Sequence, residues 1–285
     1  MQPMSRVIVF SHANGFPAGT YRTIFEAWRA AGYSVHAVEK YGHDPRWPVT
    51  NNWPHLRDQL IHCIEREANG PAWLVGHSLG GYLSLMAASR RPDLAHGVVL
   101  LDSPLVAGWK ARALQFAKAT GLTSRFSPGR FSRRRRREWD SADAAHAHFA
   151  SKPAFARFAP EVLRDYIASA TADDAQGARR LSFEREVETD IYDNLPHHLA
   201  RVLRVHPLRC PLAFVRGSAS EEVRQVGMRA TERLARGRIV TLEGGHLFPF
   251  ERPADTAAQV LRLLAEMGGP GDSPRKTTPA LARAG

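Results

Sequence analysis

Residues 71–91 read Pro-Ala-Trp-Leu-Val-Gly-His-Ser-Leu-Gly-Gly-Tyr-Leu-Ser-Leu-Met-Ala-Ala-Ser-Arg-Arg. A short apolar run, 73–75, leads into the glycine-rich residues 76–80, and Leu79, Leu83 and Met86 then recur at the spacing of one helix face. The stretch therefore predicts a strand, a sharp turn and a helix, in that order.

Ser78 lies at the apex of this predicted turn, in the sequence Gly76-His77-Ser78-Leu79-Gly80. A serine on so tight a bend adopts a strained backbone conformation and needs small neighbours, which Gly76 and Gly80 provide. Its hydroxyl group would project above the sheet, and the N–H of Leu79 would point toward a bound molecule. The alternative is a glycine-rich turn that contains a serine by chance. The strand before it and the helix after it favour the first interpretation.

Strands alternate with helices on both sides of this stretch. Apolar runs predict strands at 7–11, 33–38, 98–101, 212–216 and 239–242, and helical spacing predicts helices at 20–31, 53–64, 223–236 and 256–267. This order is typical of an α/β fold with a mostly parallel, doubly wound sheet, in which functional groups lie at the carboxyl ends of the strands. Asn14, Ser78 and Asp102 each follow a predicted strand.

The alternation stops between residues 105 and 205. This segment shows helical patterns at 105–119, 141–150, 160–170 and 184–203, without strand patterns, and it is rich in aromatic residues. We interpret it as a helical cap inserted into the core, which would then comprise residues 1–104 and 206–267. Residues 268–285 have no periodicity, as is typical of a disordered tail.

The charge of the chain is strongly basic. Its 285 residues include 39 Lys and Arg against 28 Asp and Glu, a formal net charge of +11. Such a balance raises the question of nucleic acid or acidic membranes as partners. The only dense basic run is Arg133–Arg137, however, and no nucleic-acid-binding module accompanies it. We therefore interpret the run as a solvated surface and expect no nucleic-acid partner.

The cysteines and the apolar runs indicate in which cellular compartment the protein is expected. Cys63 and Cys210 are the only cysteines, and two distant cysteines define no disulfide framework, which favours a reducing environment. The first apolar run, 7–10, is too short for a signal peptide, and no apolar stretch is long enough to span a membrane. We expect a cytoplasmic protein, with its oligomeric state left open.

The order of these parts resembles the α/β-hydrolase superfamily over residues 5–267. The loop 11–17 after the first strand is similar to that family's oxyanion loop, and residues 76–80 are similar to its nucleophile elbow. The predicted cap follows the next strand, and Gly244-Gly245-His246 comes late in the chain. The resemblance implies a nucleophile, an acid and a histidine, in this order along the chain.

By this resemblance Ser78 is the nucleophile and His246 its base. A serine hydroxyl group is a poor nucleophile at neutral pH, so a histidine must accept its proton and later return one to the leaving group. The backbone N–H groups of Leu79 and of Asn14 or Gly15 would bind the oxyanion. No cofactor is implied, and the other histidines lack a convergent set of metal ligands.

The acid departs from the commonest family pattern. In the family it usually follows the strand that corresponds to 212–216, but this chain has Ser220 there, which carries no carboxylate. Asp102 occupies the other position that the family uses, and it is the favoured candidate. Glu221 and Glu222 are the alternative candidates. A third possibility is that the chain has no competent acid.

These observations predict a cofactor-independent serine hydrolase that acts through an acyl-enzyme. Its substrate would be a small or medium acyl compound, and a carboxylic ester is the favoured one. A thioesterase, an acyltransferase or a carbon–carbon bond hydrolase would use the same residues. A catalytically silent binding protein of this fold is the alternative from another class, and Ser220 is the feature that favours it. A basic nucleic-acid or acidic-lipid binder that uses Arg133–Arg137 is a third.

Overall fold

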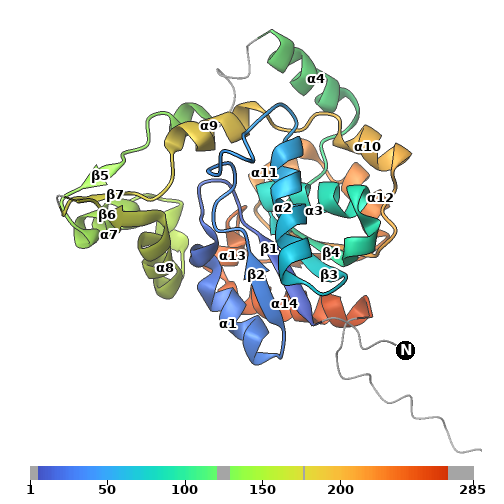
Figure 1. Ribbon diagram of the computed structural model, residues 1–285, viewed down its shortest axis with the longest axis horizontal. Helices are drawn as coiled ribbons and strands as arrows, with labels where there is room; N and C mark the ends of the chain where they lie inside the picture. The colour runs from blue at the N-terminus through green and yellow to red at the C-terminus, as the bar shows by residue number, and fades with distance from the viewer. Residues whose placement is uncertain (1–5, 121–128, 176, 269–285) are drawn as a thin grey trace, which may run out of the picture.

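The structure, a computed structural model, describes residues 6–120, 129–175 and 177–268. Its core is a six-stranded sheet of order β2-β1-β3-β4-β8-β9, in which every neighbouring pair is parallel (Figure 1). The strands are β1 (Val7–Ser11), β2 (Ser34–Ala37), β3 (Ala72–His77), β4 (Ala95–Leu101), β8 (Leu212–Gly217) and β9 (Ile239–Leu242). The predicted parallel α/β sheet is confirmed.

The register of the central strands brings their carboxyl ends to one edge of the sheet. Ser11 pairs with Gly76, His77 pairs with Leu101, and Leu101 pairs with Val215. The residues that follow β1, β3, β4 and β8 are therefore neighbours in space, although they are far apart in the sequence.

Helices cover both faces of the sheet. Alternate residues of a strand point to opposite faces, so Phe10 and Val75 pack with one buried cluster and Val9 and Leu74 with the other. The first face is covered by α1 (Arg22–Ala30), after the 3-10 turn η1 (Ala18–Tyr21), and by α14 (Pro253–Glu266), and the second by α2 (Pro54–Glu67) and α3 (Leu79–Arg90) (Figure 1). The remaining core elements are short: η2 (Pro92–Leu94), α11 (Glu221–Val226), α12 (Arg229–Ala235) and α13 (Phe248–Glu251).

The insertion between β4 and β8 is not purely helical. Its helices are α4 (Gly108–Ala119), α6 (Gly129–Ser132), α7 (Ala142–Ala150), η3 (Phe155–Arg157), α8 (Pro160–Ala170), α9 (Arg185–Asp193) and α10 (Leu199–Val205). It also holds an antiparallel sheet of order β5-β7-β6, formed by β5 (Glu138–Trp139), β6 (Thr171–Asp173) and β7 (Arg179–Leu181), beside the core in Figure 1. The prediction of a segment without strands was wrong here, because strands of two or three residues are too short to show a period.

Two predicted helices are each divided in two. Pro196 separates α9 from α10, because proline lacks the N–H group that a continuous helix needs. Gly227, with a φ of +81°, lies between α11 and α12. Apart from Gly268, the predicted tail 268–285 lies outside the described residues.

Most aromatic residues of the insertion are buried together with the core. Six of them pack in the cluster that includes Phe10 and Val75: Trp139, Phe149, Phe155, Phe158, Tyr166 and Phe183. Trp109 and Phe116 are exposed. Across the described ranges, no helix has the length and apolar character needed to cross a membrane.

Candidate active site

Ser78 occupies a sharp turn between β3 and α3. Its φ of 54° and ψ of −114° are unusual for a residue with a side chain. A Cβ atom at residue 80 would overlap the Ser11 carbonyl group, and one at residue 76 would overlap the Gly80 carbonyl group. Both positions therefore require glycine. The Ser103 hydroxyl group donates a hydrogen bond of 2.9 Å to the Ser78 carbonyl oxygen and thereby stabilises the turn.

Two other side chains reach Ser78 from neighbouring strand ends. The Nε2 atom of His246, in the loop after β9, lies 3.0 Å from Ser78 Oγ. The Nδ1 atom of the same ring lies 2.8 Å from Asp102 Oδ2. Asp102 directly follows β4 and is completely buried. The structure thus brings together the serine, histidine and aspartate that the sequence singled out, in a continuous hydrogen-bonded chain.

Asp102 is held by donors from the end of β8 and from the loop that follows it. The Gly217 N–H group donates to Oδ1 at 2.8 Å, and the Ser220 hydroxyl group donates to Oδ2, the oxygen that also contacts His246. Together with the His246 ring, these donors fix the carboxylate in one orientation. Ser220 is therefore a supporting residue that the sequence analysis did not recognise, since its partner lies 118 residues away.

The two alternative acids are placed differently. Glu222 Oε2 lies 3.6 Å from His246 Nδ1, which is beyond hydrogen-bond distance, and its side chain is 46% exposed. Glu221 pairs with Arg224 and accepts a hydrogen bond of 3.0 Å from Gln225. Of the three candidate carboxylates, Asp102 alone makes a hydrogen bond to the histidine.

A metal ion is another possible occupant of this region. Three residues, Asp102, Glu222 and His246, each offer one potential ligand atom, and these atoms all lie within 4.8 Å of one another. The His246 Nδ1 atom already faces Asp102 in a hydrogen bond. A cation would have to displace the proton of that bond, because a metal ligand must be deprotonated. The hydrogen-bonded chain and a bound metal are therefore mutually exclusive at this histidine.

The pKa of His246 reflects opposing effects. Burial lowers the pKa, but the hydrogen bond to Asp102 and the negative charges of Glu222 and Asp102 outweigh it, so that the pKa is raised above its ordinary value. The environment therefore favours the protonated imidazole more than water does.

Two loops place candidate oxyanion donors at the cavity of Ser78. Leu79 is the first residue of α3, and the N–H groups of the first helical turn have no acceptor within the helix. Asn14, in the loop after β1, lines the same cavity as Ser78 and Leu79, whereas Gly15 lines only a separate small cavity that Asn14 also borders. The Asn14 side chain donates a hydrogen bond of 2.8 Å to the Glu188 carbonyl oxygen in α9, so the insertion helps to hold this loop.

A buried hydrogen-bonded chain connects the three loops of the site. The Ala13 N–H group donates to the Tyr21 hydroxyl oxygen at 3.0 Å, and that hydroxyl group donates to His77 Nδ1 at 2.8 Å. His77 Nε2 in turn donates to the His246 carbonyl oxygen at 2.9 Å. Burial lowers the pKa of His77 well below its ordinary value, which keeps the ring neutral. His77 therefore acts as a positioning residue, and Tyr21 is a partner that the sequence analysis missed.

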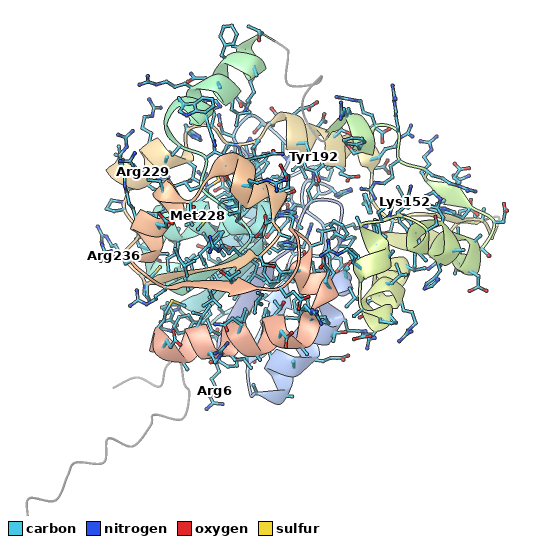
Figure 2. All side chains as sticks on the ribbon, turned by 180° about the vertical axis from the view of Figure 1, so that it is seen from behind. Arg6, Lys152, Tyr192, Met228, Arg229 and Arg236 are labelled. Carbon is cyan, nitrogen blue, oxygen red and sulfur yellow. The ribbon has the colours of Figure 1, made fainter. Side chains whose placement is uncertain are left out.

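Two cavities meet at Ser78 and His246. The smaller, of about 140 Å³, has an apolar wall that includes Trp53, Leu79, Tyr82, Val106, Ile191, Leu195 and Val226. The larger, of about 500 Å³, lies along the loop of His246 and has a mixed wall that includes the charged residues Arg157, Glu221, Glu222 and Glu251. Asn14, Glu222 and Tyr192, a residue of α9 labelled in Figure 2, line both cavities.

Most of the arginine run makes contacts inside the insertion. Arg133 pairs with Asp193 at 3.1 Å, and Arg135 pairs with the buried Glu188 at 2.7 Å. Arg136 donates to the Glu138 carbonyl oxygen, and Arg137 lies 3.7 Å from the Glu138 carboxylate. These contacts give most arginines of the run a structural role within the insertion.

Comparison with known proteins identifies related sequences and folds. The model of the "Alpha/beta hydrolase family" matches residues 8–259. Monoglyceride lipase of Mus musculus is 33% identical over 107 residues, which is 35% of either chain. Esterase Rv0045c of Mycobacterium tuberculosis is 33% identical over 98 residues, or 33% of this chain and 32% of the esterase. The matched segments thus span about a third of these relatives.

Solved structures resemble the chain over nearly its whole length. E-2-(Acetamidomethylene)succinate hydrolase superposes with a TM-score of 0.70 at 22% identity, over 92% of both chains. The thioesterase domain from the curacin biosynthetic pathway superposes with a TM-score of 0.68 at 20% identity, over 91% of this chain and 92% of that one. At these identities the likeness establishes the fold.

Proposed function

Because the chain belongs to the alpha/beta hydrolase family, we propose that it is a serine hydrolase that cleaves carboxylic esters. The observation that carries the proposal is the contact of Ser78 Oγ with His246 Nε2 at 3.0 Å, while His246 Nδ1 contacts Asp102 at 2.8 Å. This arrangement has the parts of a catalytic triad. The Asp102 contact also weighs against the silent binding protein, which the serine at position 220 had favoured.

In the acylation step, Ser78 Oγ attacks the carbonyl carbon of the ester while His246 Nε2 takes the hydroxyl proton. Asp102 stabilises the imidazolium ion that forms and keeps the ring in the required tautomer. The oxygen of the tetrahedral intermediate accepts hydrogen bonds from the N–H groups of Leu79 and Asn14. The bond from carbon to the leaving oxygen then breaks as His246 gives that oxygen the proton, and an alcohol departs.

In the deacylation step, a water molecule takes the place of the alcohol. His246 Nε2 accepts a proton from this water as its oxygen attacks the acyl-enzyme. The second tetrahedral intermediate collapses, the bond to Ser78 Oγ breaks, and the proton returns to that oxygen. A carboxylic acid is released and no external cofactor is consumed.

We assign the two halves of the ester, the alcohol and the acyl group, to the two cavities. His246 lines both cavities, but its neighbours Gly245 and Leu247 line only the larger one. We therefore place the alcohol, whose oxygen must receive its proton from His246, in the larger cavity. The acyl chain then lies in the smaller cavity, whose wall is apolar. Tyr192, from the insertion, lines both cavities, so the insertion serves as a cap over the bound ester.

The volume of the acyl cavity predicts a short acyl chain. Its space of about 140 Å³ is much smaller than the neighbouring cavity of about 500 Å³ and suits the smaller half of an ester. In a series of p-nitrophenyl esters, kcat/KM should therefore be highest at acyl chains of about four to six carbons. It should fall at longer chains, which the cavity cannot enclose.

The same series tests the proposed function. Hydrolysis of short-chain esters, together with covalent labelling of Ser78 by a serine-reactive phosphonate, is the expected outcome. Failure of the protein both to hydrolyse every ester and to react with the phosphonate would contradict the proposal. A maximum at ten or more carbons would contradict the assignment of the acyl cavity alone.

Glu222 should influence the pH dependence of hydrolysis. His246 accepts a proton only when neutral, so kcat/KM rises as the pH increases through its pKa. The Glu222 carboxylate is among the groups that raise the pKa of His246. Glu222→Gln removes this charge and should move the acidic limb of the profile to lower pH, by about half a unit for a partly exposed pair.

The measurement is kcat/KM for one short-chain ester between pH 5 and 9, with Glu221→Gln as the matched control. Glu221 is not among the groups that shift the pKa of His246, so this variant should leave the limb within about a tenth of a unit of the wild type. An acidic limb that moved to higher pH in Glu222→Gln would refute the assignment.

A further inference from the structure

The larger cavity is acidic, although the chain as a whole carries a formal charge of +11. Its wall contains three carboxylates, Glu221, Glu222 and Glu251, against one arginine, Arg157, and the His246 ring. This local reversal of charge lies where the leaving group of an ester would be bound. The charge of that leaving group therefore matters for recognition.

Two of the three carboxylates are neutralised by arginine. Glu251 pairs with Arg157 at 2.6 Å, and its side chain is only 9% exposed. Glu221 pairs with Arg224. Each of these pairs contributes little net field to the cavity, because opposite charges in contact cancel at a distance.

Among the described residues of this wall, Glu222 is the carboxylate that no arginine neutralises. Among the residues that the structure describes, it forms no ion pair with lysine or arginine, and its nearest cationic partner is the titratable ring of His246 at 3.6 Å. The buried Asp102 lies behind that ring and adds a second negative charge. A group that enters beside His246 thus meets negative potential that no arginine compensates.

Aromatic rings complete the wall. Tyr192 and Phe16 line the same cavity as Glu222. Burial chiefly raises the pKa of the Tyr192 hydroxyl group, and the negative charges of Glu188 and Glu222 add to that effect. An organic ammonium ion is attracted both to a carboxylate and to the face of an aromatic ring. The wall of this cavity therefore offers both kinds of attraction.

We propose that the larger cavity selects esters whose alcohol carries a positive charge, with Glu222 as the specificity-determining residue and Tyr192 and Phe16 as its aromatic partners. The inference rests on the proposed ester hydrolysis and adds the class of leaving group. It also disfavours polyanionic leaving groups such as nucleotide-linked thiols, because Arg157 is already paired and Glu222 repels them.

The test compares two substrates of nearly equal shape, choline butyrate and 3,3-dimethylbutyl butyrate, which differ in a quaternary nitrogen against a quaternary carbon. For the wild type, kcat/KM should favour the choline ester by about fivefold or more at low ionic strength. The preference should decline as salt is added, because salt screens exposed charges.

The matched variants are Glu222→Gln and Glu221→Gln. The ratio of the two kcat/KM values should fall to about one in Glu222→Gln and stay within about twofold of the wild type in Glu221→Gln. This ratio cancels any effect of the substitutions on His246, since both esters use the same catalytic groups.

The outcomes separate the two proposals. Hydrolysis of both esters with equal or lower kcat/KM for the choline ester would overturn the inference and leave the proposed function standing. A preference that survived in Glu222→Gln would overturn the role of Glu222. Failure to hydrolyse either ester or any p-nitrophenyl ester, with no labelling of Ser78, would overturn both proposals.

Discussion

Replacing Ser78 by alanine is expected to lower kcat for ester hydrolysis by about a millionfold, the loss found when the nucleophile of a serine hydrolase is removed. Without Oγ no acyl-enzyme can form, and His246 Nε2 loses the group that lies 3.0 Å from it. The remaining cavity and N–H groups can only assist direct attack by water. Hydrolysis of p-nitrophenyl butyrate and reaction with a phosphonate should both be abolished in practice.

The fold should tolerate this substitution. The positive φ of residue 78 is as accessible to alanine as to serine, and the hydrogen bond from Ser103 ends on the backbone carbonyl oxygen. Ser89→Ala is the matched control, because Ser89 lies at the far end of α3 and its hydroxyl group donates to the His206 carbonyl oxygen. Retained hydrolysis in Ser78→Ala, at an unchanged Tm, would refute the role of Ser78.

The turn at Ser78 could be predicted because its determinants are contiguous in the sequence. Gly76 and Gly80 are required by close contacts with the Gly80 and Ser11 carbonyl groups, and the apolar run before them forms a strand in which all residues are buried. The same holds for the parallel sheet, whose central strands are uninterrupted apolar runs. Local pattern and tertiary structure agree at these elements.

The contacts that define the rest of the site are not contiguous. Ser220 meets Asp102 across 118 residues, and His77 meets Tyr21 across 56 residues. No period or motif in a single sequence records such pairs. The strands β5, β6 and β7 were missed for a related reason, since two- or three-residue strands depend on their partners rather than on their own pattern.

The three candidate carboxylates show how the fold separates residues that the sequence left as alternatives. Asp102, Glu221 and Glu222 all lie near the strand ends by sequence. The register of β4 against β8, with Leu101 opposite Val215, brings the residue after β4 to the Nδ1 edge of His246 and beside the Gly217 N–H group. The candidate carboxylates then differ in burial and in hydrogen bonding, which is a difference that mutagenesis can measure.

Asp102→Asn should lower kcat by about ten-thousandfold, as loss of the triad carboxylate does in serine proteases. An asparagine amide at this position can donate a hydrogen bond to His246 Nδ1, which would place the ring proton on Nε2 and prevent that atom from accepting the Ser78 proton. The neutral amide also cannot stabilise the imidazolium ion. Because Gly217 and Ser220 both donate to the carboxylate, the amide would in addition direct one N–H group against a donor.

The comparison with the other carboxylates makes this prediction decisive. Glu222 lies 3.6 Å from His246 Nδ1 with half of its side chain exposed, and Glu221 is paired with Arg224. Their glutamine variants should therefore each change kcat for p-nitrophenyl butyrate by less than about tenfold at the optimal pH. A ten-thousandfold loss in Glu221→Gln or Glu222→Gln, with near-normal kcat in a folded Asp102→Asn variant, would move the acid to the loop after β8. The buried hydrogen bonds of Asp102 would then have a purely structural purpose, and the Tm of Asp102→Asn would fall while its kcat remained.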